Sequence, residues 1–374
     1  MPNIQVLIVD DSTVIRRILR EAFSADPIFE IAGAATNGRA ALMMIEQSCP
    51  DIVILDIEMP EMDGLQALTA IRERYPKLPV IMFSTLTAHG AVATVEALTR
   101  GATDYVTKSS DLGKYSDAVE RVRRQLVPKA KAICDATLFR RSAAKDAQWG
   151  VPSLNAPPLA STVIDAVAIG TSTGGPNALA SVMGAIPQDF PVPILIVQHM
   201  PPLFTKYLAE RLRASGNIPV AEAKHGEELF AGGAWIAPGD YHMTVVRNGT
   251  HVRIQTNQNP AENSCRPSVD VLFRSVAKAY GRSTLAVVMT GMGQDGLRGC
   301  EHIKVAGGQV LAQDEHSSVV WGMPGFVAKA GLADRVLPLD QIGAEIVRRV
   351  RMYSGSRTKY DFPEVGNGHR RAGI

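Results

Sequence analysis

Cysteine is scarce in this sequence, and the few cysteines that occur are scattered. The 374 residues contain four of them, Cys49, Cys134, Cys265 and Cys300. No two have the C-x-x-C spacing that is typical of zinc and redox motifs, so the pattern argues against a disulfide framework and against a zinc site. This usage of cysteine fits a protein of the reducing cytosol.

Long apolar runs and an excess of charge of one sign are also missing. No stretch approaches the length of a membrane span, and the N-terminus has neither the basic start nor the apolar run of a secretory signal. The net charge is only +2, so no strong field favours nucleic acid as a partner. We therefore expect a cytoplasmic protein with no membrane insertion and no nucleic-acid binding, and the length predicts two domains.

Residues 1–125 alternate between short apolar runs and helical patterns. The apolar runs have the length of buried strands, and amphipathic patterns separate them. This strict β/α alternation predicts an α/β domain, in which helices cover both faces of a parallel sheet. The predicted strands lie at residues 6–9, 31–34, 52–55, 80–83 and 105–106.

Polar residues follow these predicted strands at the points where the strands end. Asp10 and Asp11 follow the first strand, Asp56 the third, Ser84 the fourth and Lys108 the fifth. The carboxyl ends of parallel strands meet at one edge of a sheet, where three carboxylates would repel one another unless a cation such as Mg²⁺ lay among them. Helix capping or turn formation explains any one of these residues, but polar residues at four strand ends together favour a site.

This first domain resembles the response-regulator receiver family, which has a flavodoxin-like, doubly wound, five-stranded parallel sheet. The resemblance implies that Asp56 accepts a phosphoryl group from a histidine kinase, and that Ser84 and Lys108 contact the phosphoryl oxygens. It also implies a switch aromatic at Tyr105. The implied Mg²⁺ ligands are Asp10, Asp11, Asp56 and the backbone carbonyl of Glu58. The resemblance is carried by Asp10 and Asp11, Asp56 with residues 59–64, Ser84, and residues 101–108.

Two segments have compositions that do not predict a core. Residues 126–160 are rich in charged and small side chains and contain three prolines near their end, which predicts a flexible tether. Residues 353–374 are polar and rich in glycine, which predicts a disordered tail. Between them, residues 161–352 form a second predicted domain.

The second domain also follows an α/β pattern, with a mostly parallel sheet and one β-hairpin whose turn carries Asn248-Gly249. Its first strand, residues 166–169, breaks into a Gly/Ser/Thr turn that matches G-x-S-x-G and has Ser172 at its centre. In a strand-to-helix turn this pattern is typical of a nucleophilic serine. Close packing or anion binding by the turn is an equally good reading of this stretch alone.

Three residues of the second domain could form a catalytic triad. Ser172, His199 and Asp295 each follow an apolar run, so each can project from the carboxyl edge of the sheet. A serine nucleophile needs a histidine base, and the base needs a carboxylate that holds its tautomer. The glycines on both sides of Met292 leave backbone N–H groups free as oxyanion donors. The simpler alternatives are a structural histidine for His199 and a turn residue for Asp295.

This second domain resembles the catalytic domain of the chemotaxis protein-glutamate methylesterase and protein-glutamine glutaminase family. The resemblance implies Ser172 as nucleophile, His199 as base, Asp295 as its orienter, the Met292 N–H as oxyanion donor and Thr173 beside the substrate. Family members have a histidine or a similar residue before the Arg-Pro-Ser segment, where this chain has Cys265. The motifs that carry the resemblance lie at residues 169–176, 197–201, 236–243, 266–273 and 290–296.

The two resemblances together imply a hydrolase of chemotaxis adaptation that belongs to a two-component system. It would demethylate glutamate methyl esters on the cytoplasmic helices of chemoreceptors, release methanol, and deamidate receptor glutamines. The receiver domain would inhibit the esterase until a chemotaxis kinase phosphorylates Asp56, and the esterase site would need no cofactor. An alternative is a phosphorylation-switched adaptor with an inactive esterase-like domain; a DNA-binding output is less favoured because no basic recognition helix is evident.

Overall fold

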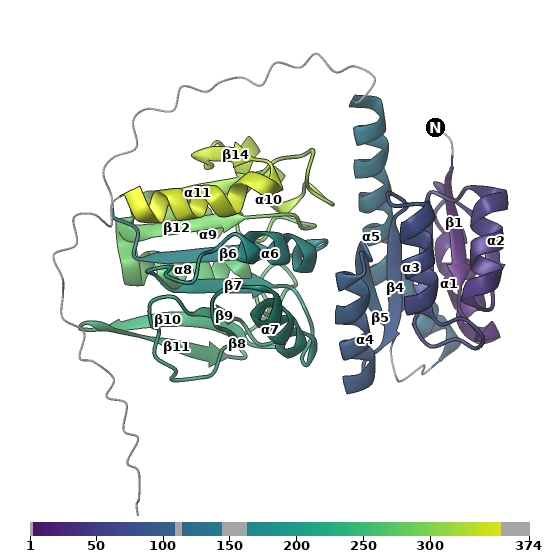
Figure 1. The fold of residues 1–374 in the computed structure, drawn as a ribbon, viewed down its shortest axis with the longest axis horizontal. Coiled ribbons are helices and arrows are strands. Elements are labelled where there is room, and N and C mark those ends of the chain that lie inside the picture. Colours follow the sequence, from purple (N-terminus) through teal and green to yellow (C-terminus); the bar gives the residue numbers. More distant parts are fainter. Residues whose placement is uncertain (1–2, 109–113, 144–162, 353–374) are drawn as a thin grey trace, which may run out of the picture.

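The computed structural model describes residues 3–108, 114–143 and 163–352. They form two α/β units (Figure 1). The first unit is a five-stranded sheet in the order β2-β1-β3-β4-β5, and every neighbouring pair is parallel. It confirms the predicted doubly wound receiver fold. Its elements are β1 (Ile4–Val9), α1 (Thr13–Ser24), β2 (Phe29–Ala35), α2 (Gly38–Ser48), β3 (Ile52–Asp56), α3 (Gly64–Arg74), β4 (Val80–Thr85), α4 (Ala88–Thr99), β5 (Asp104–Lys108) and α5 (Tyr115–Ala143).

Helix α5 differs from the sequence prediction because it is much longer. It was expected to end near residue 126, where the tether was expected to begin, but it continues to Ala143. The prediction of a tether is therefore wrong for residues 126–143. This stretch has an apolar face in spite of its many charged residues. Leu126, Ala130 and Ile133 are buried in the same hydrophobic cluster as residues of the receiver sheet. The rest of the predicted tether, 144–160, and the predicted tail, 353–374, lie outside the described residues.

The second unit is a seven-stranded sheet in the order β14-β13-β12-β6-β7-β9-β8, again with parallel pairs throughout. A separate antiparallel pair, β10-β11, is the predicted hairpin. The elements are β6 (Ala166–Thr171), α6 (Gly175–Gly184), β7 (Ile194–Gln198), α7 (Phe204–Ser215), β8 (Val220–Glu222), β9 (Ala234–Ile236), β10 (His242–Asn248), β11 (His251–Asn257), α8 (Val269–Tyr280), the 3₁₀ turn η1 (Gly281–Ser283), β12 (Thr284–Val288), α9 (Leu297–Val305), β13 (Gln309–Gln313), α10 (Met323–Lys329), β14 (Arg335–Leu337) and α11 (Leu339–Met352).

The strands β8 and β14 and the helix α10 were not predicted from the sequence. Both strands are three residues long and lie at the two edges of the sheet. Short edge strands are exposed on one side and carry little periodic signal. The central strands β6, β7 and β12 were predicted because every residue in them is buried, which gives continuous apolar runs.

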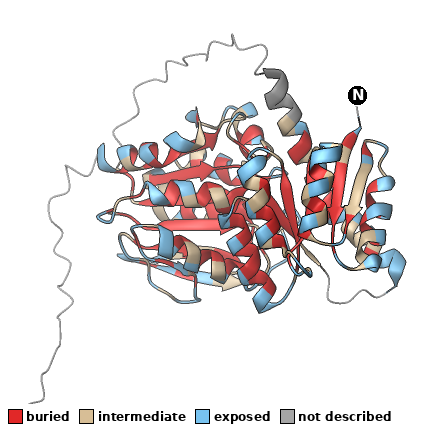
Figure 2. Ribbon diagram, turned by 45° about the vertical axis from the view of Figure 1, so that its right-hand side comes forward, coloured by how far each residue is buried: buried red, intermediate tan, exposed pale blue. Residues whose placement is uncertain are grey.

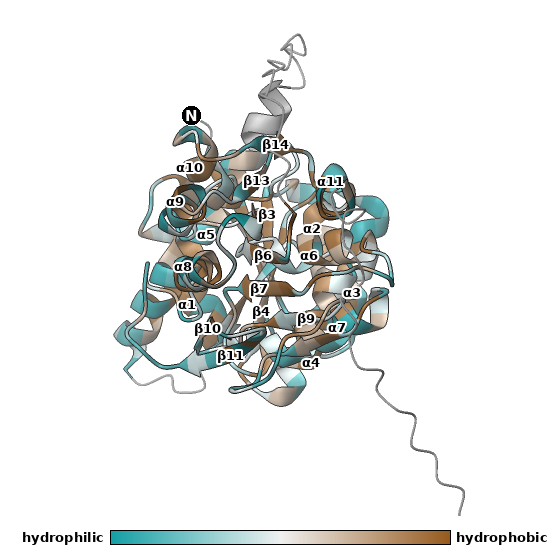
Figure 3. Cartoon of the chain, turned by 90° about the vertical axis from the view of Figure 1, so that its left-hand side faces the viewer, coloured by the Kyte–Doolittle hydropathy of each residue, from teal (hydrophilic) through white to brown (hydrophobic). Residues whose placement is uncertain are grey.

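The buried strands of both units form the centre of the molecule, and the exposed residues lie on the outer faces of the helices (Figure 2). The view along the long axis shows the same arrangement in hydropathy, with apolar strands such as β7 inside hydrophilic outer surfaces (Figure 3). No described helix is both long and apolar enough to cross a membrane. In the second unit, α6 and α7 start where β6 and β7 end, so their N-termini mark the carboxyl edge of the sheet.

Candidate functional site

The carboxyl edge of the receiver sheet carries a compact cluster of charges. The ammonium Nζ of Lys108 lies 2.8 Å from Asp10 Oδ2 and 2.7 Å from Asp56 Oδ1. Both carboxylates are almost fully buried. The oxygens of Asp10, Asp11 and Asp56 come close enough to one another to hold one cation, and carboxylate oxygens are ligands that Mg²⁺ prefers.

The ionisation of this cluster is shifted by burial and by charge. Burial raises the pKa of Asp10, and it raises the pKa of Asp56 to about 6, because a buried carboxylate prefers to be neutral. For Lys108, burial by itself would lower the pKa, but the carboxylates of Asp10 and Asp56 outweigh burial and raise it. Burial of the two carboxylates therefore outweighs the attraction of Lys108, and a cation bound among their oxygens would favour the ionised forms.

The other predicted receiver residues lie around this cluster. Asp11 and Glu58 are exposed next to Asp10 and Asp56. Ser84 is buried at the end of β4, and its hydroxyl donates to the Gly90 carbonyl, 3.1 Å away, and not to Asp56. Tyr105 is buried at the start of β5 and points away from the cluster toward the second unit.

In the second unit, Ser172 lies in the turn that joins β6 to α6. The preceding residue, Thr171, pairs with Gln198 at the end of β7, so Ser172 and His199 follow paired positions on adjacent strands. The turn is held tightly: the Ser172 N–H donates to the Thr290 carbonyl at 3.0 Å, and the Gln198 amide donates to the Ser172 carbonyl at 3.0 Å. A Cβ atom at Gly175 would lie 1.9 Å from Gln198 Oε1, so only glycine allows this approach.

His199 and Asp295 are joined directly. His199 Nε2 lies 2.8 Å from Asp295 Oδ2. Burial by itself would raise the pKa of Asp295, but its hydrogen bonds with His199 and with backbone N–H groups outweigh burial and lower the pKa to about 2. The carboxylate is therefore ionised and only accepts, so Nε2 donates its proton to Asp295, and in the neutral form of the imidazole Nδ1 has the lone pair.

The sequence did not reveal the residues that hold Asp295 in place. Its Oδ1 accepts from the Ser268 hydroxyl at 2.8 Å, from the Asn263 amide at 3.0 Å and from the Asp270 N–H at 3.0 Å, while Oδ2 accepts from the Val269 N–H at 2.7 Å. Two of these donors are first-turn amides of α8, which favour a negative charge. The Arg-Pro-Ser motif at 266–268 was the available signal, because it stands directly before this helix.

The second ring nitrogen of His199 faces a cysteine. Cys265 Sγ lies 3.5 Å from His199 Nδ1. No hydrogen bond joins Ser172 Oγ to His199 within the described part of the chain. Burial by itself would lower the pKa of His199, but its hydrogen bonds with Asp295 and Cys265 outweigh burial and raise the pKa above its usual range. The structure thus brings together His199 and Asp295 as predicted, and it adds Cys265 at the nitrogen that faces away from the carboxylate.

Met292 and Thr173 flank Ser172. A Cβ atom at Gly291 would lie 2.8 Å from Ser172 Cβ, which places the turn that contains Met292 directly over the serine. Met292 is exposed, and its N–H makes no hydrogen bond with any residue that the structure describes. Thr173 is buried, and its carbonyl accepts from the Thr290 hydroxyl at 2.8 Å.

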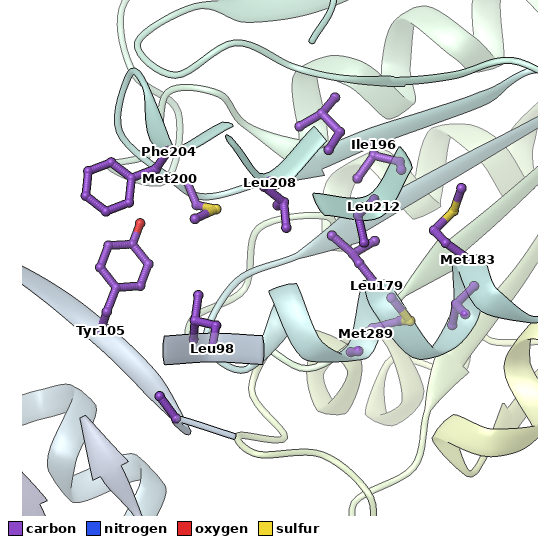
Figure 4. Packing of buried hydrophobic residues seen from close by; sticks show 14 of the residues in the cluster. Leu98, Tyr105, Leu179, Met183, Ile196, Met200, Phe204, Leu208, Leu212 and Met289 are labelled. Atoms are coloured by element: carbon purple, nitrogen blue, oxygen red, sulfur yellow. The ribbon is translucent and has the colours of Figure 1, made fainter. Parts of the chain in front are cut away.

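The receiver unit packs against the edge of the second unit that carries this site. The ring of Tyr105 stacks on the ring of Phe204 at the start of α7, and Leu98 and Met200 lie beside this pair (Figure 4). The amide of Asn177, in the first turn of α6, donates to the Ala102 carbonyl at 3.0 Å. Phe204 and Asn177 each come five residues after a site residue, His199 and Ser172, so the domain interface borders the site.

Two family models match the two units of the chain. The family model of the CheB methylesterase matches residues 167–346, and that of the response regulator receiver domain matches residues 6–120. The crystal structure of the Thermotoga maritima CheB methylesterase catalytic domain is 41% identical and has a TM-score of 0.49, with 50% of this chain and 99% of that chain covered.

Curated relatives match along nearly the whole chain. A protein-glutamate methylesterase/protein-glutamine glutaminase of Trichodesmium erythraeum is 52% identical, with 94% of this chain and 100% of the relative covered. One of Nocardioides sp. is 48% identical, with 94% of this chain and 96% of the relative covered. This extent of identity exceeds what a shared fold alone would give. The chain belongs to the protein-glutamate methylesterase/protein-glutamine glutaminase family, with a response regulator receiver domain ahead of a CheB methylesterase domain.

Proposed function

We propose that this chain hydrolyses glutamate methyl esters on chemoreceptors and deamidates receptor glutamines, under control of its receiver domain. The observation that carries the proposal is the 2.8 Å contact between His199 Nε2 and Asp295, beside Ser172 at the carboxyl edge of the sheet. An ionised carboxylate on one nitrogen of an imidazole makes the other nitrogen an effective base. The relatives that match the whole chain carry both activities in their names.

The reaction starts at the serine. Ser172 Oγ attacks the ester carbonyl carbon while His199 Nδ1 accepts the hydroxyl proton. The tetrahedral species then collapses: the bond to the methoxy oxygen breaks, His199 returns its proton to that oxygen, and methanol leaves. Water attacks the acyl-serine in the same way and releases glutamate. With glutamine as substrate, ammonia takes the place of methanol.

The oxyanion and the histidine are stabilised by fixed groups. The Met292 N–H follows Gly291, which approaches Ser172, and it makes no hydrogen bond with the residues that the structure describes, so it would donate to the developing oxyanion. Thr173 would lie beside the substrate. Ser172 must displace the Cys265 thiol from His199 Nδ1 when it reacts. Such hydrogen bonds commonly form only once the substrate is bound.

The receiver domain would act as the switch. Asp56 would accept the phosphoryl group of the chemotaxis histidine kinase, and Ser84 and Lys108 would contact its oxygens. Asp10, Asp11, Asp56 and the Glu58 carbonyl would hold Mg²⁺, which neutralises charge when it is bound. The control would be steric, since the packing of Tyr105 on Phe204 and of Ala102 on Asn177 places the receiver at the edge that carries Ser172.

The test is methanol release from carboxyl-methylated receptor membranes. Wild type, Ser172→Ala and the control Ser215→Ala are compared, each with and without a small-molecule phosphodonor. Ser215 is a matched control because its hydroxyl only donates to the Arg211 carbonyl within α7. Release that needs Ser172 and rises with phosphodonor supports the proposal. Release that survives Ser172→Ala contradicts the serine mechanism, and no release from the wild type, while the receiver accepts phosphate, favours the adaptor alternative.

A further inference from the structure

We propose that His199 and Cys265 form a binding site for a thiophilic divalent cation such as Zn²⁺, and that the bound cation inhibits the esterase. The pair consists of His199 Nδ1 and Cys265 Sγ, 3.5 Å apart. Together with Asp295 they are one of the clusters of possible metal ligands among the described residues. The other cluster is the all-carboxylate receiver site, whose hard oxygens suit a different kind of cation.

The separation of the two atoms matches a tetrahedral zinc ion. Zinc binds an imidazole nitrogen at about 2.0–2.1 Å and a cysteine sulfur at about 2.3 Å. At the tetrahedral angle these two bonds place nitrogen and sulfur about 3.5 Å apart. The observed distance is also that of a hydrogen bond between the thiol and the imidazole. The two atoms therefore already have the separation of two ligands on one zinc ion, which would replace the thiol proton.

The hydrogen bond between His199 Nε2 and Asp295 favours metal binding at His199 Nδ1. A metal-binding histidine typically donates its other N–H to a carboxylate, which fixes the tautomer and raises the basicity of the ligand. His199 Nε2 has this partner in Asp295, and Asp295 is itself held by Ser268 and by two backbone N–H groups. The imidazole thus directs Nδ1 toward Cys265, and a cation would bind there in competition with a proton.

The two ligand side chains are not fully enclosed by the protein. Both His199 and Cys265 are partly exposed, so a hydrated cation can reach them from solvent. On binding, the thiol releases its proton to water, the sulfur–metal and nitrogen–metal bonds form, and water completes the coordination. Two protein ligands make a reversible site and not a structural one. Cysteine spacing in the sequence could not reveal it, because the partner of Cys265 is a histidine 66 residues earlier in the chain.

Inhibition follows from the position of the cation. A metal bound to His199 Nδ1 occupies the nitrogen that takes the proton of Ser172 in the proposed function. This part of the inference rests on that function, but the binding of the cation does not. The binding is therefore tested by a spectroscopic measurement, and the inhibition is tested separately.

The binding test uses Co²⁺ on the full-length protein in excess Mg²⁺, which occupies the receiver site. A thiolate ligand gives Co²⁺ an intense charge-transfer absorption in the near ultraviolet, and Zn²⁺ should displace it. We expect the band in wild type and in Cys49→Ser, whose cysteine is exposed at the end of α2 in the receiver unit, and we expect it to disappear in Cys265→Ser. No band in wild type, or a band that persists in Cys265→Ser, would overturn the proposal.

The inhibition test uses Zn²⁺ and methanol release, with each variant compared with its own metal-free rate. Zn²⁺ should inhibit wild type and Cys49→Ser, and a chelator should restore the rate. Loss of an outer partner of a metal ligand weakens binding by about 10–100-fold, so loss of the ligand in Cys265→Ser should raise the inhibitory concentration by at least about tenfold. If Co²⁺ binds at Cys265 but neither cation slows methanol release, the result supports the metal site and contradicts the role of His199 as the base of the proposed reaction.

Discussion

The ring of Tyr105, in the receiver domain, stacks on the ring of Phe204, in the esterase domain, with centroids 5.0 Å apart and an interplanar angle of 8°. Tyr105 stands three residues before Lys108, which contacts Asp56, and Phe204 stands five residues after His199. This stacked pair therefore joins β5, which carries Lys108, to α7, which follows His199 in the chain. Any movement of Tyr105 must repack the start of α7.

Replacing Tyr105 should weaken the packing of the receiver on the esterase domain. A stacked aromatic pair contributes about 0.5–1.5 kcal/mol beyond the area that it buries. We expect Tyr105→Ala to raise the rate of methanol release without phosphodonor by about three- to tenfold, and to reduce the further gain on adding phosphodonor. An unchanged rate without phosphodonor would show that this contact does not restrain the enzyme.

The hydrogen bond between the domains allows a second, better matched comparison. Asn177→Ala removes the donor to the Ala102 carbonyl and, inside the esterase domain, the acceptor of Arg211. Asn217→Ala removes only donors to carbonyls inside the esterase domain, so it controls for a loss of that second kind. One such bond contributes about 0.5–1.5 kcal/mol. The first variant should raise the rate without phosphodonor about two- to tenfold, and the second should not. Equal effects of the two variants would indicate a general loss of stability instead.

Ser268 should matter for the reaction although it touches no substrate, because it positions Asp295. Its hydroxyl donates to Asp295 Oδ1 at 2.8 Å in a buried environment. Hydrogen bonds to charged groups contribute about 1.5–3 kcal/mol, so Ser268→Ala should lower kcat/KM by about 10- to 100-fold, and Ser268→Thr should restore part of it. Ser275→Ala is the control, since Ser275 lies on α8, which Ser268 directly precedes, and among the described residues its hydroxyl bonds with Val245 and Leu272 and not with Asp295.

The pH dependence of the esterase should reflect the raised pKa of His199. The base must be neutral to accept the serine proton, and the hydrogen bonds with Asp295 and Cys265 stabilise its protonated form despite burial. The rate should therefore still be rising with pH above 7, where an ordinary histidine is already neutral. Cys265→Ser should shift the profile toward lower pH. A rate that levels off below pH 7 in the wild type would contradict this reading.

Asp56→Asn should stabilise the receiver domain at neutral pH. Burial raises the pKa of Asp56 to about 6, while the unfolded chain has a value of about 3.9. The folded state thus keeps a proton that the unfolded state loses, so stability falls as pH rises from 4 to 6, and the loss is complete above pH 6. Asparagine avoids this loss, which is about 3 kcal/mol at most.

The measurement is the receiver transition in scanning calorimetry of the full-length protein. Asp56→Asn should raise its midpoint at pH 8 and raise it much less near pH 4, where the wild-type carboxyl is neutral in the folded state and about half neutral in the unfolded state. Mg²⁺ should raise the midpoint of the wild type more than that of the variant. A lower midpoint for the variant at pH 8 would mean that Lys108 stabilises the ionised Asp56 more than burial destabilises it.

The sequence by itself determined the two α/β units and the positions of their site residues in the chain. Buried parallel strands are continuous apolar runs, and the polar residues that follow them, such as Asp56, Ser172 and His199, must meet at the carboxyl edges of the sheets. The apolar runs and the polar residues that follow them are patterns of neighbouring residues, so they can be recognised in a single sequence. The short edge strands and the extension of α5 were missed because local pattern there is weak or masked by charge.

Only the tertiary structure decided which side chains meet across long distances in the chain. Asn263 and Ser268 donate hydrogen bonds to Asp295, and the thiol of Cys265 contacts His199. In each pair the two residues are more than twenty-five positions apart in the chain. The stack of Tyr105 on Phe204 joins two domains. Such contacts depend on how sheets and helices are placed in space, and no periodicity or spacing in the sequence encodes that placement.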